Sequence, residues 1–371
     1  MKKQNNLWMH LLLVLVLFLL SGCNMGSTSD DDTVVMTDLI GREVAVPVTV
    51  ERVVAIGPGA LRMIAYAGDL DLVVGVEQMD ADSSFGKPYM LANPELAQLP
   101  IIGLGGPANA PDAEQLITVA PDVIFSTYAL EAAVVDELQT KTGIPVVVIT
   151  YSMQGFGVTD IFDQIVQDSL RLVGEVCGTQ QKAQSAIDVI LDAQQDLQDR
   201  TANISADDSP SVYVGGLGSK GMHGIESTQG EYMLLDVIQA NNVADDTGQR
   251  GAVMIDKEQL LAWDPELIFI DLNGYLSVAE DYQKNPTFYN ALTAVQNGQV
   301  YGLLPYNYYN TNLGTAIADA YYLGSLIHPE AFADLDPIEK ADEIYSALLG
   351  EAVYAKMAQD FGGFGPLDLG D

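Results

Sequence analysis

The sequence predicts an α/β fold of two Rossmann-like lobes with mainly parallel sheets, joined by a long interdomain helix. A twelve-residue pattern at 114–125 returns at 258–269, with Glu, Gln, Leu, Pro, Ile and Phe at matching places. Short apolar strand patterns alternate with helical ones on both sides of residues 158–205, as in parallel α/β folds. A helical pattern of ~22 residues, about 33 Å long, lies between the two copies. The repeat predicts two similar lobes with a cleft between them, where small ligands commonly bind.

The N-terminal residues are typical of an export signal. Lys2 and Lys3 precede an apolar run over 11–20, which is shorter than the ~20 residues that a membrane span needs. The run ends in Leu-Ser-Gly before Cys23. We therefore expect a lipoprotein signal peptide over 1–22, lipidation of Cys23, and a flexible tether over 23–32; an uncleaved anchor helix is the alternative. The protein is then expected on the extracytoplasmic face of the cell envelope, lipid-anchored to the membrane.

Cysteine usage and charge exclude some classes. If Cys23 is acylated, Cys177 has no partner, so the fold depends on its core rather than on disulfides. The formal net charge is −35 at pH 7, which argues against a nucleic-acid partner because such proteins need basic patches. The acidic residues are scattered, and we interpret them as a solvated surface.

The N-terminal α/β lobe is expected over 33–157 and the helical connector over 158–205. Gly and Pro residues divide the apolar patterns into separate elements. The expected elements of the first lobe are a hairpin around Gly41, strands at 52–56, 72–76, 123–126 and 145–150, and helices at 60–67, from 111, and at 130–142. The connector is expected as a helix from 159, a break between Gly174 and Gly178, and a long helix over 180–201.

The C-terminal α/β lobe is expected over 206–371. It contains the second copy of the repeat, whose strand ends at Asp271, and a Gly-rich stretch over 215–224. The remaining expected elements are strands at 211–214 and 299–304, a loop at 305–312, helices at 231–240, 315–327 and 336–349, and an irregular tail over 361–371.

Motifs over about residues 33–350 resemble those of the substrate-binding lipoproteins of ABC importers for iron chelates, haem and corrinoids. The matching motifs are DxxGRxV at 38–44, RVV at 52–54, DxVVGV at 71–76, EQL at 114–116 with PD at 121–122, GIPVV at 143–147, NVA at 242–244, and EQL at 258–260 with PE at 265–266. The resemblance implies two lobes, a stiff connecting helix and a shallow cleft that closes little. It also implies an ABC permease and its ATPase as partners, and a monomer.

Glu114 and Glu258 stand at the positions where this resemblance implies contact with permease arginines. Two carboxylates on a rigid body can fix a docking orientation by charge. The alternative is that each glutamate serves its own helix, because each lies in a first turn after an aspartate.

Ligand contacts are expected from loops at the carboxyl ends of the strands. These loops hold Tyr and Asn, which hydrogen-bond and stack, and several of the few basic residues. The candidates are Arg62, Tyr128, Tyr151, Lys220, His223, Arg250, Tyr275, Tyr306, Asn307, Tyr308 and Tyr309. The alternatives are that Arg62 pairs with an acid, that the Gly-rich stretch is an ordinary turn, and that the 306–309 residues belong partly to the core.

The expected cargo is a metal chelate: a ferric siderophore, haem or a corrinoid. An oxyanion such as molybdate or tungstate is the alternative, and an enzyme acting in the cleft is a weaker one, because no nucleophile elbow or zinc-helix motif is present. The chain has three histidines, one of them in the leader, so a bare Zn²⁺ or Mn²⁺ site is not expected. No cofactor is expected, since any metal would arrive inside the cargo.

Overall fold

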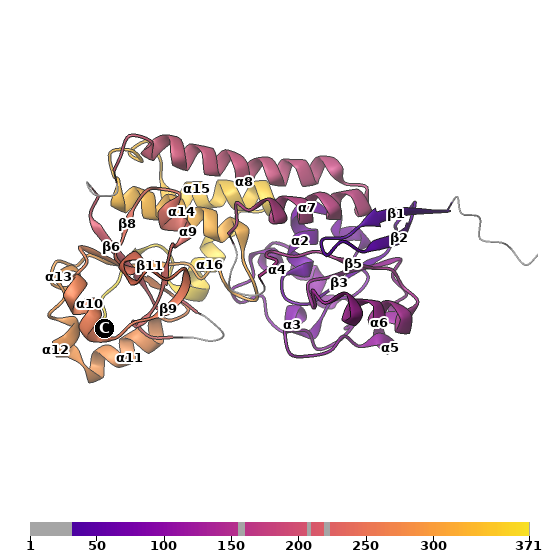
Figure 1. Ribbon diagram of the computed structural model, residues 1–371, viewed down its shortest axis with the longest axis horizontal. Coiled ribbons are helices and arrows are strands. Elements are labelled where there is room, and N and C mark those ends of the chain that lie inside the picture. Colours follow the sequence, from indigo (N-terminus) through magenta and orange to yellow (C-terminus); the bar gives the residue numbers. More distant parts are fainter. Residues whose placement is uncertain (1–31, 155–159, 206–208, 219–222, 371) are drawn as a thin grey trace, which may run out of the picture.

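The computed structural model describes residues 32–154, 160–205, 209–218 and 223–370. Two α/β lobes lie side by side, and one long helix runs along both of them (Figure 1). The predicted fold class is confirmed. Cys23 and the expected signal peptide lie outside the described residues, as does the tether apart from its last residue. No helix in the described ranges has the length and apolar character needed to cross a bilayer.

The N-terminal lobe is built on a parallel three-stranded sheet with the order β3-β4-β5. Every residue of these strands is buried, as expected for strands covered on both faces. A hairpin, β1 and β2, turns at Gly41, which takes a positive φ of 80°. The elements are β1 Thr33–Thr37, β2 Glu43–Pro47, β3 Val53–Ile56, α2 Ala60–Ala67, η2 Leu70–Leu72, α3 Gln78–Ala81, α4 Pro88–Ala92, η3 Pro94–Gln98, α5 Ala113–Val119, β4 Val123–Ser126, α6 Ala132–Thr142 and β5 Val146–Val148.

The strand expected over 72–76 is wrong. A 3₁₀ turn ends at Leu72, and only Val73 and Val76 form single parallel bridges, to Val53 and Ile101. Asp69 caps this turn by accepting a hydrogen bond from the Asp71 backbone. The local aspartate hydrogen bond thus holds the chain in a turn where apolar residues alone suggested a strand.

The connector consists of α7 (Gln164–Cys177) and α8 (Gln180–Thr201). They are separated at Gly178, whose φ of 70° is the left-handed conformation that ends helices. The 22 residues of α8 span about 33 Å, and α8 packs against α2 of the first lobe and α14 and α15 of the second. The predicted long interdomain helix is present with the predicted bounds.

The C-terminal lobe has a five-stranded sheet with the order β12-β11-β10-β6-β8, parallel except for β12. A separate antiparallel pair, β7 and β9, lies beside it. Its elements are β6 Ser211–Gly215, β7 Ser227–Gly230, α9 Met233–Asp236, β8 Asn241–Asn242, η5 Val243–Thr247, β9 Gly251–Met254, α10 Lys257–Trp263, β10 Leu267–Asp271, α11 Tyr275–Lys284, α12 Pro286–Tyr289, α13 Thr293–Gln296, β11 Val300–Leu303, α14 Leu313–Ile327, α15 Pro337–Leu349, α16 Tyr354–Phe361 and β12 Gly365–Pro366.

Two expectations for this lobe are wrong. The helix expected over 231–240 is one turn only, because Glu231 and Gln239 both take positive φ and interrupt the helical backbone on either side. The tail is not irregular throughout, since β12 pairs with β11 and Leu369 is buried.

The sequence repeat corresponds to a repeated structure, α5–β4 in one lobe and α10–β10 in the other. Each helix begins at an aspartate side chain that accepts backbone N–H groups. Each ends at a left-handed residue, Ala120 or Asp264. Leu116 and Leu260 are fully buried at matching places. The duplication predicted from sequence is therefore present in the backbone.

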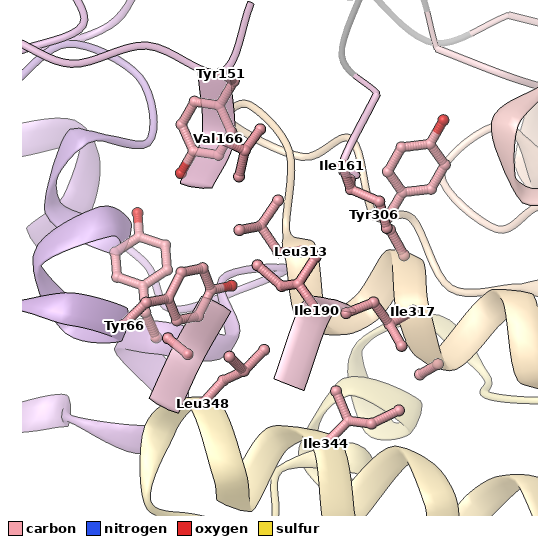
Figure 2. Packing of buried hydrophobic residues seen from close by; sticks show 14 of the residues in the cluster. Tyr66, Tyr151, Ile161, Val166, Ile190, Tyr306, Leu313, Ile317, Ile344 and Leu348 are labelled. Carbon is pink, nitrogen blue, oxygen red and sulfur yellow. The ribbon is translucent and has the colours of Figure 1, made fainter. Parts of the chain in front are cut away.

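The core is continuous from one lobe to the other. Figure 2 shows Tyr66 of α2, Ile190 of α8, Leu313 of α14 and Leu348 of α15 converging. Helix α15 also contacts α2 and α4 of the N-terminal lobe. The second lobe is thus held to the first by packed helices as well as by the connector.

Candidate functional site

Two neighbouring hollows lie where the lobes meet, and Tyr151 and Ser152 line both of them. The smaller, called here the interlobe pocket, has a volume of about 190 Å³. Its lining residues are Thr127, Tyr128, Ala129, Leu130, Glu131, Thr150, Tyr151, Ser152 and Asn310. The larger, called here the acidic pocket, has a volume of about 270 Å³ and includes Asp160, Asp163, Glu231, Asp236, Arg250 and two glutamines of α8.

The interlobe pocket is built at the carboxyl ends of β4 and β5, as expected for a parallel sheet. Its hydroxyl groups are held in place by hydrogen bonds to backbone carbonyls. Thr127 Oγ1 donates to Pro58 O at 2.9 Å, Thr150 Oγ1 to Ser152 O at 2.9 Å, and Tyr151 OH to Gly59 O at 2.9 Å. The pocket therefore has a wall of ordered oxygen atoms.

Helix α6 begins in the wall of the same pocket. Its N-cap residue, Glu131, makes no capping hydrogen bond with its side chain. The first N–H groups of α6 are thus not satisfied by a capping side chain. The positive end of the helix dipole favours negative charge here, whereas the Glu131 carboxylate opposes it.

Arg62 does not line either pocket. It is fully buried in α2, and its guanidinium donates to the backbone carbonyls of the other lobe: Tyr308 O at 3.1 Å, Tyr309 O at 3.0 Å and Thr311 O at 3.0 Å. It forms no ion pair with the described acidic residues, contrary to the alternative interpretation. The Arg62 guanidinium, which was predicted to meet a ligand, thus joins the lobes instead.

Residues 306–312, called here the bridging loop, are fastened to the N-terminal lobe by side chains as well. Asn310 Nδ2 donates to Pro58 O at 3.0 Å, and Asn312 Nδ2 donates to Gly86 O at 3.3 Å. Tyr309 and Asn310 take positive φ values of 50° and 70°, which cost energy in non-glycine residues. The contacts to the other lobe offset this strain.

Glu77 receives the bridging loop on the N-terminal side. Its Oε2 accepts hydrogen bonds from Gly57 N at 2.9 Å and from Tyr309 OH at 3.2 Å. Burial, and then the nearby Asp80 charge, raises the pKa of Glu77 to about 7. Lys87 lies close, its Nζ 5.4 Å from the centre of the Tyr309 ring.

The predicted tyrosines have different surroundings. Tyr128 and Tyr151 line the interlobe pocket. The Tyr308 ring packs on Phe85 and Phe361, and Tyr309 packs against the N-terminal lobe. Tyr306 and Asn307 line a separate small cavity of about 20 Å³, and Tyr275 OH donates to Asp368 O at 3.1 Å.

The predicted basic residues are also dispersed. Arg250 lines the acidic pocket and pairs with Glu231 at 3.3 Å. His223 is half-buried, and Lys220 lies outside the described residues. Burial, and then Asp245, raises the pKa of Asp236 in the acidic pocket to about 6.

Sequence reasoning missed Asn310, Glu77 and Lys87. Asn310 is the one residue of the C-terminal lobe among the described residues that line the interlobe pocket, and it directly follows the predicted tyrosines. Glu77 and Lys87 come from irregular segments, where no strand end marked them. No group of three or more His, Cys, Asp or Glu within the described ranges is arranged to hold a metal ion.

Glu114 and Glu258 are exposed in the first turns of α5 and α10. The caps of these helices are the preceding aspartates: Asp112 accepts from the backbone of Glu114 and Gln115, and Asp256 accepts from that of Gln259. Both helices lie on the side of the molecule away from α8 (Figure 1). The two carboxylates therefore remain free of a capping role.

Comparison with known proteins supports the fold and the family. A family model described as "Periplasmic binding protein" matches residues 53–306. The molybdate-binding protein MolA of Haemophilus influenzae is 24% identical over 357 residues, covering 91% of this chain and 96% of MolA. An uncharacterized ABC transporter substrate-binding lipoprotein of Bacillus subtilis, YvrC, is 23% identical over 315 residues, covering 82% and 91%.

The backbone is also similar to solved structures. A periplasmic solute-binding protein of Veillonella parvula superposes with a TM-score of 0.69 at 19% identity, over 89% of this chain and 96% of that protein. The structure of MolA bound to molybdate gives a TM-score of 0.65 at 20% identity, over 86% and 98%.

Proposed function

This chain belongs to the periplasmic binding protein family and is a solute-binding protein of an ABC importer, and on that premise we propose that its cargo is a small oxyanion held in the interlobe pocket. The sequence favoured a metal chelate and kept the oxyanion as the alternative. The volume of the pocket is the observation that reverses this order.

Size argues for a cargo of few atoms. Pockets for drug-sized ligands usually measure about 300–1,000 Å³, whereas the interlobe pocket measures about 190 Å³. A tetrahedral oxyanion fits within such a volume, whereas a haem or a ferric siderophore would extend beyond it. A larger cargo would have to displace the bridging loop, which is held by Arg62 and by Asn310.

The chemistry of the walls supports the same class. Hydroxyls of Tyr128 and Ser152 can donate to anionic oxygens. The uncapped start of α6 adds a positive dipole. The positive charge of Arg62 lies close behind the Tyr151 wall, because both side chains adjoin Gly59. A Cβ atom added to Gly59 would lie 3.1 Å from Arg62 Nη1 and 2.9 Å from the Tyr151 ring. The similarity to a molybdate-binding protein agrees with this class.

Isothermal titration of the purified protein tests the cargo. We expect molybdate or tungstate to bind with one-to-one stoichiometry, and a Tyr128→Phe, Ser152→Ala double variant to bind at least ten times more weakly. Tyr282→Phe, which removes a hydroxyl far from the pocket in α11, is the matched control. Binding of haem or a ferric siderophore, with no response to oxyanions, would refute the proposal and restore the chelate.

We also propose that Glu114 and Glu258 contact the permease and that Cys23 carries the lipid anchor. The same exposed face of a first turn recurs on both lobes, which suits a partner with two matching contact points. In an uptake assay, Glu114→Ala with Glu258→Ala should abolish transport and leave binding unchanged. Glu339→Ala is the matched control, since Glu339 is an exposed first-turn glutamate after the capping residue Asp336.

A further inference from the structure

A second polar cluster lies inside the C-terminal lobe, apart from the interlobe pocket. Along β10, Leu267 and Phe269 face the large core that includes α14, whereas Ile268 and Ile270 face the opposite core. Because side chains alternate along a strand, Asp271 faces the same side as Phe269. Asp319 of α14 approaches this side, because its Oδ1 accepts a hydrogen bond from Leu304 N at 3.2 Å. Leu304 directly follows Leu303, which pairs with Asp271 in the sheet. Two carboxyl groups thus meet at one edge of the sheet.

Among the described residues, no cation balances this cluster, and one of its carboxylate oxygens has no hydrogen-bond partner. Asp271 and Asp319 are buried, and neither forms an ion pair with the described basic residues. Asp319 Oδ2 makes no hydrogen bond with any described residue. Unpaired buried carboxylates are costly, so the cluster requires a proton or a bound cation.

The cavity of about 20 Å³ opens at this cluster. Asp271, Thr228 and Tyr306 line it, together with Leu217, Gly218, Ser227, Gln229, Ala252 and Asn307. A space of this size holds one particle as large as a water molecule. Thr228, which is only 1% exposed, belongs to the lining. The polar atoms of the named cluster are all oxygens, which hard cations prefer.

We propose that this cavity binds a monovalent hard cation of the size of Na⁺, held by Asp271, Thr228 and the neighbouring Asp319 and Tyr306. The described residues supply two carboxylates here, and the space admits one particle. Ca²⁺ needs six to eight oxygen ligands and fits less well. The proposal does not depend on the nature of the cargo, because the site lies within one lobe.

Thermal unfolding of the full chain at pH 8 tests this site. The net charge of −35 makes any salt stabilising by screening, so NaCl is compared with choline chloride at equal ionic strength. A cation bound only by the folded state raises Tm by mass action, and we expect Na⁺ to raise it by about 2–4 °C more than choline. Asp319→Asn and Thr228→Val should each remove this difference.

The control and the contrary outcomes separate the explanations. Asp334→Asn removes an exposed carboxylate that pairs with Arg200, and it should keep the full Na⁺ response. If Asp319→Asn fails to fold, Thr228→Val and ²³Na line broadening of the wild-type protein still decide the matter. Equal Tm values in Na⁺ and choline would show that a shared proton neutralises the pair and would overturn the proposal. A larger response to micromolar Ca²⁺ would overturn the monovalent assignment.

Discussion

Replacing Arg62 with Met tests whether the bridging loop determines the shape of the cargo pocket. The substitution removes three donated hydrogen bonds, to Tyr308, Tyr309 and Thr311 carbonyls, at 3.0–3.1 Å. Hydrogen bonds to charged groups contribute about 1.5–3 kcal/mol each, but removing a fully buried guanidinium also removes its desolvation cost. The three carbonyls lose their donor, and a buried group left without a partner costs about 1–3 kcal/mol, so we expect a net loss of about 3–5 kcal/mol.

Urea unfolding followed by tyrosine fluorescence measures this loss. Arg171→Met is the matched control, because Arg171 pairs with Asp168 at the surface, with each side chain 43% exposed, and such pairs contribute about 0–1 kcal/mol. Arg62→Lys should recover little stability, since one ammonium cannot reproduce the planar fork of donors. In Arg62→Met, limited proteolysis should cut residues 306–312 faster and oxyanion affinity should fall. If Arg62→Met matches Arg171→Met in stability and protease resistance, the loop is held by other contacts and our reasoning is wrong.

Three further outcomes follow from the site. Glu131→Gln should raise oxyanion affinity about three- to tenfold by calorimetry, because it removes the one carboxylate in the described wall of the interlobe pocket; unchanged affinity would mean that the anion binds elsewhere. Stability should fall as pH rises from about 4.5 to 7, because burial raises the pKa of Glu77 in the folded state to about 7. The protonated carboxyl stabilises the fold below its unfolded pKa, and this contribution is lost as Glu77 ionises. Glu77→Gln should therefore reduce the dependence of stability on pH in urea titrations, and an unchanged dependence would contradict the role of Glu77. Gly57→Ala should weaken cargo binding and cost more stability than Gly143→Ala, since both glycines have positive φ but only at Gly57 would the new Cβ lie 2.6 Å from Tyr128 N; equal costs in thermal unfolding would refute the close approach.

The fold was predictable where local patterns and tertiary structure agree. The helix 60–67 has the expected bounds because Gly59 and Gly68 lie at its ends, and the helix 180–201 has the expected start because Gly178 separates it from α7. The repeat predicted the duplicated α5–β4 and α10–β10 units for the same reason: the same caps and the same buried leucines recur. The prediction of a helix over 231–240 was wrong because no sequence pattern indicates the left-handed conformations of Glu231 and Gln239.

The site was only partly predictable, because its key contacts join residues far apart in the chain. Tyr128 and Tyr151 could be placed after strands from the sequence, although only β4 ends where predicted and β5 ends two residues before the predicted end. The contact of Tyr309 with Glu77 joins positions 232 residues apart, and no local pattern indicates such a pair. Arg62 was singled out as a rare basic residue near the cleft, yet the sequence could not show that backbone carbonyls would accept its hydrogen bonds.

The arrangement of the lobes bears on how this protein selects its cargo. On one side α8 and α15 pack against both lobes, and elsewhere the bridging loop joins them through Arg62, Asn310 and Asn312. A hinge movement large enough to admit a chelate would have to break both sets of contacts. Shear or hinge closure around a ligand is favourable only when few packed contacts are lost. Selection is therefore expected to depend on a pocket of fixed size with ordered donors. A larger solute would be rejected because its binding requires the bridging loop to move and the contacts between the lobes to break, and not because it lacks contacts with the pocket.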